Sequence, residues 1–156
     1  MIFEFLKKRP YLLLFATSIL FLLLKIFLNT NSKTTLNISD TYFVISRKDV
    51  YLIVFILLGI TSLVYMLLDF FRINISKRSI LFHIFGLLTT IILFFYLNDL
   101  SDQFDLKKKE FEDLINPTDF NKYIFIVILI TISLQFFFLI NIFVSIIKKL
   151  RTSVTK

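Results

Sequence analysis

The stretch VYLIVFILLGITSLVYMLL, residues 50–68, contains no charged residue. A helix rises about 1.5 Å per residue, so this run is long enough to cross a hydrocarbon core of about 30 Å. Similar runs occupy residues 11–28, 80–97 and 123–147. Lipid offers no water to exposed backbone groups, and each run is therefore expected to be a helix rather than an open strand. The predicted fold class is an all-α integral membrane protein with four transmembrane helices in an antiparallel bundle.

The composition indicates the same class. Of the 156 residues, 57% are hydrophobic and 21 are Phe, and the mean hydropathy is +0.83, which exceeds the apolar share of ordinary soluble domains. Residues 1–156 are expected to form a single membrane domain, with the lipid bilayer as its first partner. Basic residues before position 11 resemble the start of a signal peptide, but no A-x-A-like cleavage site follows the first run, which is therefore expected to stay as a helix.

Lysine and arginine beside the predicted helices indicate the orientation. The N-terminus, the 72–79 loop and the C-terminus carry ten of them in short segments, whereas the two other loops carry seven in longer ones. Basic residues next to a span are retained on the cytoplasmic side, so both termini are predicted to be cytoplasmic. We expect a multi-pass protein of a bacterial inner membrane. Its net charge of +7 then reflects topology and contact with anionic lipid, and no nucleic-acid partner is expected.

The loop between the third and fourth runs shows a helical stripe of apolar residues, formed by Leu100, Phe104, Phe111, Leu114 and Ile115. This spacing predicts a short amphipathic helix in the outer loop, ending near Pro117. Thr118 or Asp119 would cap the helix that follows. Such a helix could bind a partner or gate the protein, but resting as a lid on the bundle or the lipid is the simpler interpretation.

Polar residues inside the runs are few. Lys25 lies near the outer end of the first run, where its side chain can reach the interface. Asp69 lies three residues before Arg72, a spacing that permits an ion pair on one helix surface. Both are expected to be anchors rather than transport residues.

The fourth run carries an arc of polar side chains about 120° wide, at about 100° per residue. Its members are Thr131, Gln135, Asn141 and Ser145, while Ser133 falls outside. The arc is expected to face the bundle and to form hydrogen bonds between helices. In the third run, Gly86 and Thr90 form a weak small-xxx-small pair that favours close packing.

No pattern of residues predicts catalysis. The chain has one histidine, His83, and no cysteine. A lone histidine near a helix end is usually interfacial, and a metal or haem site needs further ligands. Gly59 and Gly86 are the only glycines, so a phosphate-binding glycine-rich loop is absent. The chain is expected not to be an enzyme and to bind no cofactor.

The segment ISDTYFVISRKDVYL, residues 38–52, leads into the second run. Ser46 followed by Asp49 resembles a capping box for a helix that begins next to it. Arg47 and Lys48 would then be solvated residues of the first turn, at the membrane surface.

The same segment resembles subunit I of the haem-copper cytochrome oxidases, which carries H-D-T-Y-[YF]-V-V-[AG]-H-F-H-Y-V-L between an outer loop and a helix. SDTYFVISRKDVYL aligns with that pattern without gaps. The resemblance implies a relation to the last four helices of that subunit and placement of this segment on the outer side. It is specific over roughly nine residues around Asp40 to Ser46 and otherwise depends on helix spacing.

Departures from the family pattern alter its chemistry. The two haem-ligating histidines of the family fall at Arg47 and Asp49, and a guanidinium cannot coordinate iron. The magnesium-ligating His-Asp pair becomes Ser39 and Asp40, which leaves Asp40 as a weak metal candidate, since a hard cation needs several oxygens. A cap of the loop is the simpler role for Asp40. The structural or interface candidates are Asp40, Tyr42, Arg47, Asp49, Gln135 and Asn141.

Two functions of different class follow. The first is a small non-catalytic membrane protein that associates with other membrane proteins, including a respiratory complex, or with copies of itself. The second is a small transporter or ion-conducting oligomer that uses Lys25, Asp69 and the polar arc. An ion path normally places ionisable groups near the bilayer midplane. Lys25 and Asp69 lie near helix ends, so the first function is favoured.

Overall fold

The computed structural model describes residues 9–28, 33–38, 41–73, 75–110 and 120–154. The elements in these residues are, in chain order, α2 (Tyr11–Phe27), β1 (Lys33–Ile38), β2 (Thr41–Ser46), α3 (Arg47–Phe70), α4 (Lys77–Glu110) and α5 (Phe120–Val154). Three helical segments, Arg47–Phe70, Lys77–Gln103 and Phe120–Arg151, are long and apolar enough to cross a membrane. Helix α2 is apolar but shorter, with 17 residues. The predicted helical runs are thus all helices.

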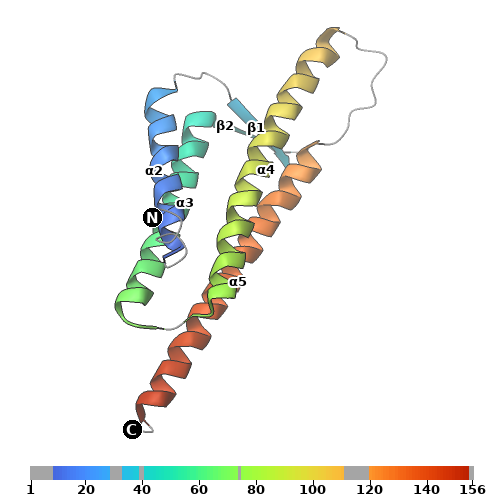
Figure 1. Ribbon diagram of the computed structural model, residues 1–156. Coiled ribbons are helices and arrows are strands. Elements are labelled where there is room, and N and C mark those ends of the chain that lie inside the picture. Colours follow the sequence, from blue (N-terminus) through green and yellow to red (C-terminus); the bar gives the residue numbers. More distant parts are fainter. Residues whose placement is uncertain (1–8, 29–32, 39–40, 74, 111–119, 155–156) are drawn as a thin grey trace.

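The helices pack as two pairs, α2 against α3 and α4 against α5 (Figure 1). Leu14 and Leu58 are fully buried in the first pair, and Ile84, Leu87 and Ile124 are buried in the second. At Gly86 the helices approach so closely that a Cβ atom would lie 3.1 Å from two methyl carbons of Leu134. A larger residue at position 86 would therefore require the Leu134 side chain to shift, so glycine favours this close contact between α4 and α5.

Large apolar side chains point outward along every helix. Examples are Ile92, which is 69% exposed in the middle of α4, and Phe136 and Ile140 on α5, which are 62% and 61% exposed. An apolar surface of this extent is rare on soluble monomers and matches contact with lipid. The structure therefore belongs to a helical membrane protein.

A two-stranded hairpin precedes α3, which corrects the expectation of helices alone. Strands β1 and β2 pair antiparallel, with Lys33 opposite Ser46 and Ile38 opposite Thr41. Both segments, KTTLNI and TYFVIS, are rich in the β-branched and aromatic residues that favour strands. The rule against open strands applies to hydrocarbon, whereas this hairpin belongs to the segment between the apolar helices α2 and α3.

Helix α4 also corrects the expectation of a separate amphipathic helix in the following loop. It continues without a break from Lys77 to Glu110, and its far end extends beyond the hairpin (Figure 1). No Gly or Pro occurs between Gly86 and Pro117, so nothing in the sequence ends the helix near residue 100. Phe111, Leu114, Ile115 and the proposed caps Thr118 and Asp119 lie outside the described residues.

Candidate partner-binding groove

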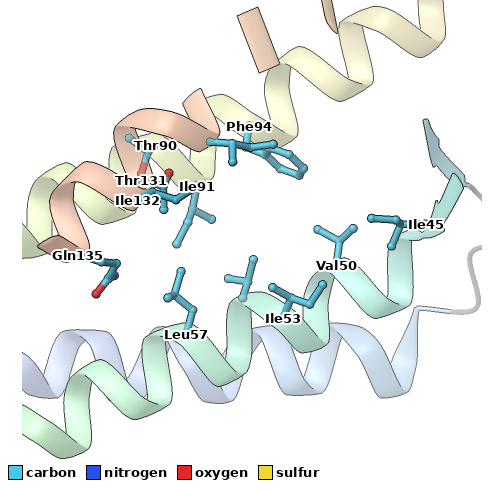
Figure 2. Close-up of a pocket in the computed structure, with 12 residues that line it drawn as sticks. Ile45, Val50, Ile53, Leu57, Thr90, Ile91, Phe94, Thr131, Ile132 and Gln135 are labelled. Atoms are coloured by element: carbon cyan, nitrogen blue, oxygen red, sulfur yellow. The ribbon is translucent and has the colours of Figure 1, made fainter. Parts of the chain in front are cut away.

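An apolar groove of about 320 Å³ separates the two helix pairs. Side chains of α3 face those of α4 and α5 across it (Figure 2). The groove is lined by Ile45, Val50, Ile53, Val54, Leu57, Thr90, Ile91, Phe94, Ile128, Thr131, Ile132 and Gln135. The groove is partly open, so it is accessible from the surroundings of the helices.

Gln135 brings an amide to this apolar wall. Its Nε2 is buried and has no hydrogen-bond partner among the described residues. The residue lies at the midpoint of the apolar run 123–147, so about 18 Å of helix separates it from either end of that run. A buried donor without an acceptor costs roughly 1–3 kcal/mol. The wall of the groove therefore contains a buried donor that has no acceptor among the described residues.

The polar arc of α5 lies on the predicted side of the helix. Thr131, Gln135, Asn141 and Ser145 are half-buried, whereas Ser133 is exposed. The prediction of hydrogen bonds between helices is wrong for two members of the arc. The Thr131 hydroxyl donates to the Val127 carbonyl at 2.9 Å, and Asn141 Nδ2 donates to the Phe137 carbonyl at 2.9 Å. Both bonds stay within α5, where a carbonyl one turn back is the nearest acceptor.

Arg47 connects the two helix pairs at the hairpin end of the groove. Its Nη2 lies 2.6 Å from Asp99 Oδ1 and 3.2 Å from Asp102 Oδ2, and both carboxylates belong to α4. The Arg47 side chain is only 17% exposed. The expectation of a solvated first-turn arginine is therefore wrong, because two carboxylates from a distant segment replace water around the guanidinium.

The capping box is also absent. Ser46 is the N-cap residue of α3, but its side chain forms no capping hydrogen bond. Asp49 is exposed in the first turn, where a negative charge favours a helix N-terminus. Tyr42 belongs to β2, opposite Asn37. Asp40 lies outside the described residues.

Three aromatic rings pack together about one helical turn from Arg47. The Tyr51 ring on α3 lies 6.1 Å from Phe21 of α2 and 5.4 Å from Phe95 of α4, and Phe21 stacks on Phe95 at 5.7 Å. Aromatic pairs at these separations add to simple area burial. The rings thus bring α2, α3 and α4 together at this end.

A second polar contact connects the helix pairs at the opposite end of the groove. The Tyr65 hydroxyl of α3 lies 3.0 Å from His83 Nδ1 of α4. The His83 ring stacks on Phe138 of α5 at 4.7 Å, with an interplanar angle of 3°. His83 is 1% exposed and its Nε2 has no partner among the described residues. The expectation of an interfacial histidine is wrong, because side chains from three helices enclose the ring.

Asp69 forms contacts other than the predicted one. The Tyr11 hydroxyl donates to Asp69 Oδ2 at 2.7 Å, and Arg9 Nε lies 3.9 Å from the same oxygen. The residue expected as its partner, Arg72, instead has a positive φ of 53° in the turn after α3. The left-handed backbone there ends the helix, so an ion pair along the helix surface is not formed. Asp69 therefore connects α3 to α2.

Sequence reasoning identified Gln135 but missed the two contacts between the helix pairs. Arg47 and its carboxylates are 52 and 55 residues apart, and Tyr65 and His83 are 18 apart. No local spacing marks such pairs. A count of charges at the same predicted membrane surface would have grouped Arg47 with Asp99 and Asp102, but it would not have selected them from the other charges on that side. Among the described residues, no group of three or more His, Asp or Glu side chains could hold a metal ion.

Comparisons with known proteins add no relative. The chain matches no protein-family model, no curated protein and no solved structure.

Proposed function

We propose that this chain is a non-catalytic membrane protein that receives a transmembrane helix of another protein in the groove between its helix pairs. In this proposal the chain spans a bacterial inner membrane four times, with both termini in the cytoplasm. Charge supports that orientation: Arg9, Lys77 and Lys149 lie at one end of the helices, and Asp99 and Asp102 lie at the other. With 17 residues, α2 is about 26 Å long, close to the thickness of the hydrocarbon core.

The unpartnered amide of Gln135 is the observation that carries the proposal. Lipid acyl chains also fit an apolar groove, but their ester oxygens lie about 15 Å from the bilayer centre. A neighbouring helix can present an Asn, Gln, Ser or Thr oxygen at the required depth, and such bonds hold membrane helices together. The occupant is therefore a helix with a polar side chain near its midpoint.

The segment that leads into α3 provides our candidate for the complex. The resemblance of residues 39–52 to subunit I of the haem-copper oxidases makes a respiratory complex our first candidate. The family's haem ligands are replaced by Arg47 and Asp49, and Arg47 serves instead to connect α3 to α4. This substitution supports an accessory role rather than a catalytic one.

The test is affinity purification of the tagged chain from native membranes in mild detergent, followed by quantitative mass spectrometry. We expect a stoichiometric membrane partner with the wild type. Gln135→Leu should reduce its recovery at least threefold, which corresponds to an interhelical hydrogen bond of about 0.6–1 kcal/mol. A photo-crosslinking residue at Ile132, which lines the groove, should attach to a transmembrane helix of the same partner.

Ser133→Leu is the matched control, because Ser133 lies on the same helix but on its exposed side. Its partner recovery should equal that of the wild type. Gln135→Leu should itself remain folded, because leucine removes an unsatisfied donor. Recovery that is unaffected by Gln135→Leu, crosslinks to lipid or to a second copy only, or a chain purified alone would each contradict the proposal.

A small transporter is the second candidate function, and the burial of His83 favours it. This residue places an ionisable side chain inside the helices, where such groups often belong to a proton path. Proteoliposomes containing the purified chain would then show a proton flux that His83→Phe abolishes. A flux equal to that of empty liposomes would leave the binding function as the better account.

A further inference from the structure

A second cavity, of about 330 Å³, lies at the end of the molecule opposite the hairpin. The start of α2, the end of α3 and the start of α4 enclose it. Its lining includes the apolar side chains of Leu68, Ile73, Ile75, Ile80 and Leu81, together with Tyr11, Tyr65, Asp69 and Lys77. An apolar wall with one carboxylate and one ammonium group matches an amphipathic molecule rather than a soluble ion.

The charges around this cavity are mostly positive. Lys77 lines it and forms no ion pair within the part of the chain that the structure describes. Arg72 and Arg78 lie next to lining residues, and the Lys149 ammonium group donates to the Phe71 carbonyl in the adjacent turn. Basic pockets between membrane helices on the cytoplasmic side attract anionic headgroups.

Besides the positive charges that attract an anionic headgroup, the cavity contains a hydrogen-bond acceptor, the Asp69 carboxylate. Its Oδ2 accepts a hydrogen bond from Tyr11 at 2.7 Å, which fixes the carboxylate, and its side chain is 54% exposed. A fixed and accessible carboxylate accepts further hydrogen bonds but repels a bare phosphate. A suitable ligand therefore has both a phosphate for Lys77 and hydroxyl donors for Asp69.

We propose that this cavity binds a phospholipid with a glycerol headgroup, that is, phosphatidylglycerol. Its phosphodiester lies at Lys77, the headgroup hydroxyls donate to Asp69, and the start of an acyl chain contacts Ile80 and Leu81. The site is separate from the groove that contains Gln135. It requires only that this end of the helices lies at a membrane surface, so it does not depend on the proposed partner.

The absence of tryptophan from the chain permits a direct test. Leu81→Trp would place a single tryptophan at this cavity, where Leu81 is 42% exposed. The purified variant is reconstituted in phosphatidylcholine vesicles that contain a small fraction of lipid with brominated acyl chains. Quenching should rise above random mixing for brominated phosphatidylglycerol, and less for phosphatidylethanolamine or phosphatidic acid.

Three substitutions in this background separate binding at the site from general attraction to a basic surface. Lys77→Gln should lower the relative affinity for phosphatidylglycerol about fivefold, whereas Arg78→Gln, which removes the same charge from a neighbouring position outside the cavity, should lower it less than twofold. Asp69→Asn should lower the affinity for phosphatidylglycerol and, because it removes the charge that repels a bare phosphate, should raise that for phosphatidic acid.

Equal losses for Lys77→Gln and Arg78→Gln would overturn the proposal, because they indicate attraction to the whole basic surface. Random quenching by all three lipids would overturn it as well. Soluble glycerol phosphate should not relieve the quenching, and relief at low concentration would assign the cavity to a free anion instead. Circular dichroism of each variant confirms folding, and partner recovery should be unchanged by Lys77→Gln, which distinguishes this site from the groove.

Discussion

Replacement of Arg47 by Gln should loosen the connection between the two helix pairs. In the structure Arg47 Nη2 lies 2.6 Å and 3.2 Å from carboxylate oxygens of Asp99 and Asp102. Glutamine is shorter, carries no charge and cannot reach both carboxylates. The Tyr65–His83 contact at the other end of the groove remains intact in this variant. The helix pairs should therefore separate first at the hairpin end.

The loss of stability expected for Arg47→Gln depends on the exposure of Arg47, Asp99 and Asp102. Asp99 is 54% exposed and Asp102 is 44% exposed, so both carboxylates regain water when Arg47 is lost. The large penalty for leaving a buried charge unpaired therefore does not apply. Each of the two ion pairs contributes about 0.2–1 kcal/mol to stability. Arg47 is 17% exposed, which places both pairs in the upper part of that range. Arg47→Gln should destabilise the protein by about 1–2 kcal/mol.

Unfolding in mixed micelles by increasing SDS, followed by circular dichroism, measures this loss. A double-mutant cycle of Arg47→Gln with Asp99→Asn should give a coupling energy of about 0.5–1 kcal/mol, which falls at high salt. Asp49→Asn serves as the control, because Asp49 is exposed on the same helix turn and should not couple to Asp99. A loss below about 0.3 kcal/mol for Arg47→Gln, or no coupling to Asp99, would refute the contact.

Three further predictions concern packing and topology. Gly86→Val should lower the free energy of unfolding by about 1–3 kcal/mol in the same assay, because the new side chain meets Leu134 methyl groups 3.1 Å from Cβ. Adding Leu134→Ala should recover part of this stability. A Gly86→Val variant as stable as the wild type would contradict the close approach of the helices. Tyr65→Phe should lower the free energy of unfolding by about 1 kcal/mol, because it leaves His83 Nδ1 unpaired. Adding His83→Phe should restore stability, since neither side chain then carries a polar atom. A double variant less stable than Tyr65→Phe would refute the energetic role of this hydrogen bond. Reporter fusions at residues 35, 76 and 110 and at the C-terminus should locate outside, inside, outside and inside, and an inward position for residue 110 would exclude the proposed orientation.

The helices were accessible to prediction because lipid restricts backbone choice. A long apolar run has few alternatives to a helix when no water is present, so residues 50–68 alone predicted most of α3. The side of α5 that turns inward also followed from local periodicity, since Gln135 and Ser133 fall on opposite faces. Outside the hydrocarbon this restriction disappears. The hairpin at 33–46 was missed because polar and β-branched residues in a loop permit strands, turns or coil.

The sequence by itself indicated a membrane protein, the positions of its helical runs and the uneven distribution of basic residues between the two ends. Each of these features depends on composition or on neighbours a few positions apart. Only the tertiary structure decided which residues meet. Arg47 meets Asp99, and Tyr65 meets His83, because two helix pairs lie side by side at a particular offset. The same placement leaves an apolar groove and an unpartnered Gln135 amide between them. Contacts of this kind depend on the packing of whole helices against each other, and no short stretch of sequence specifies that packing.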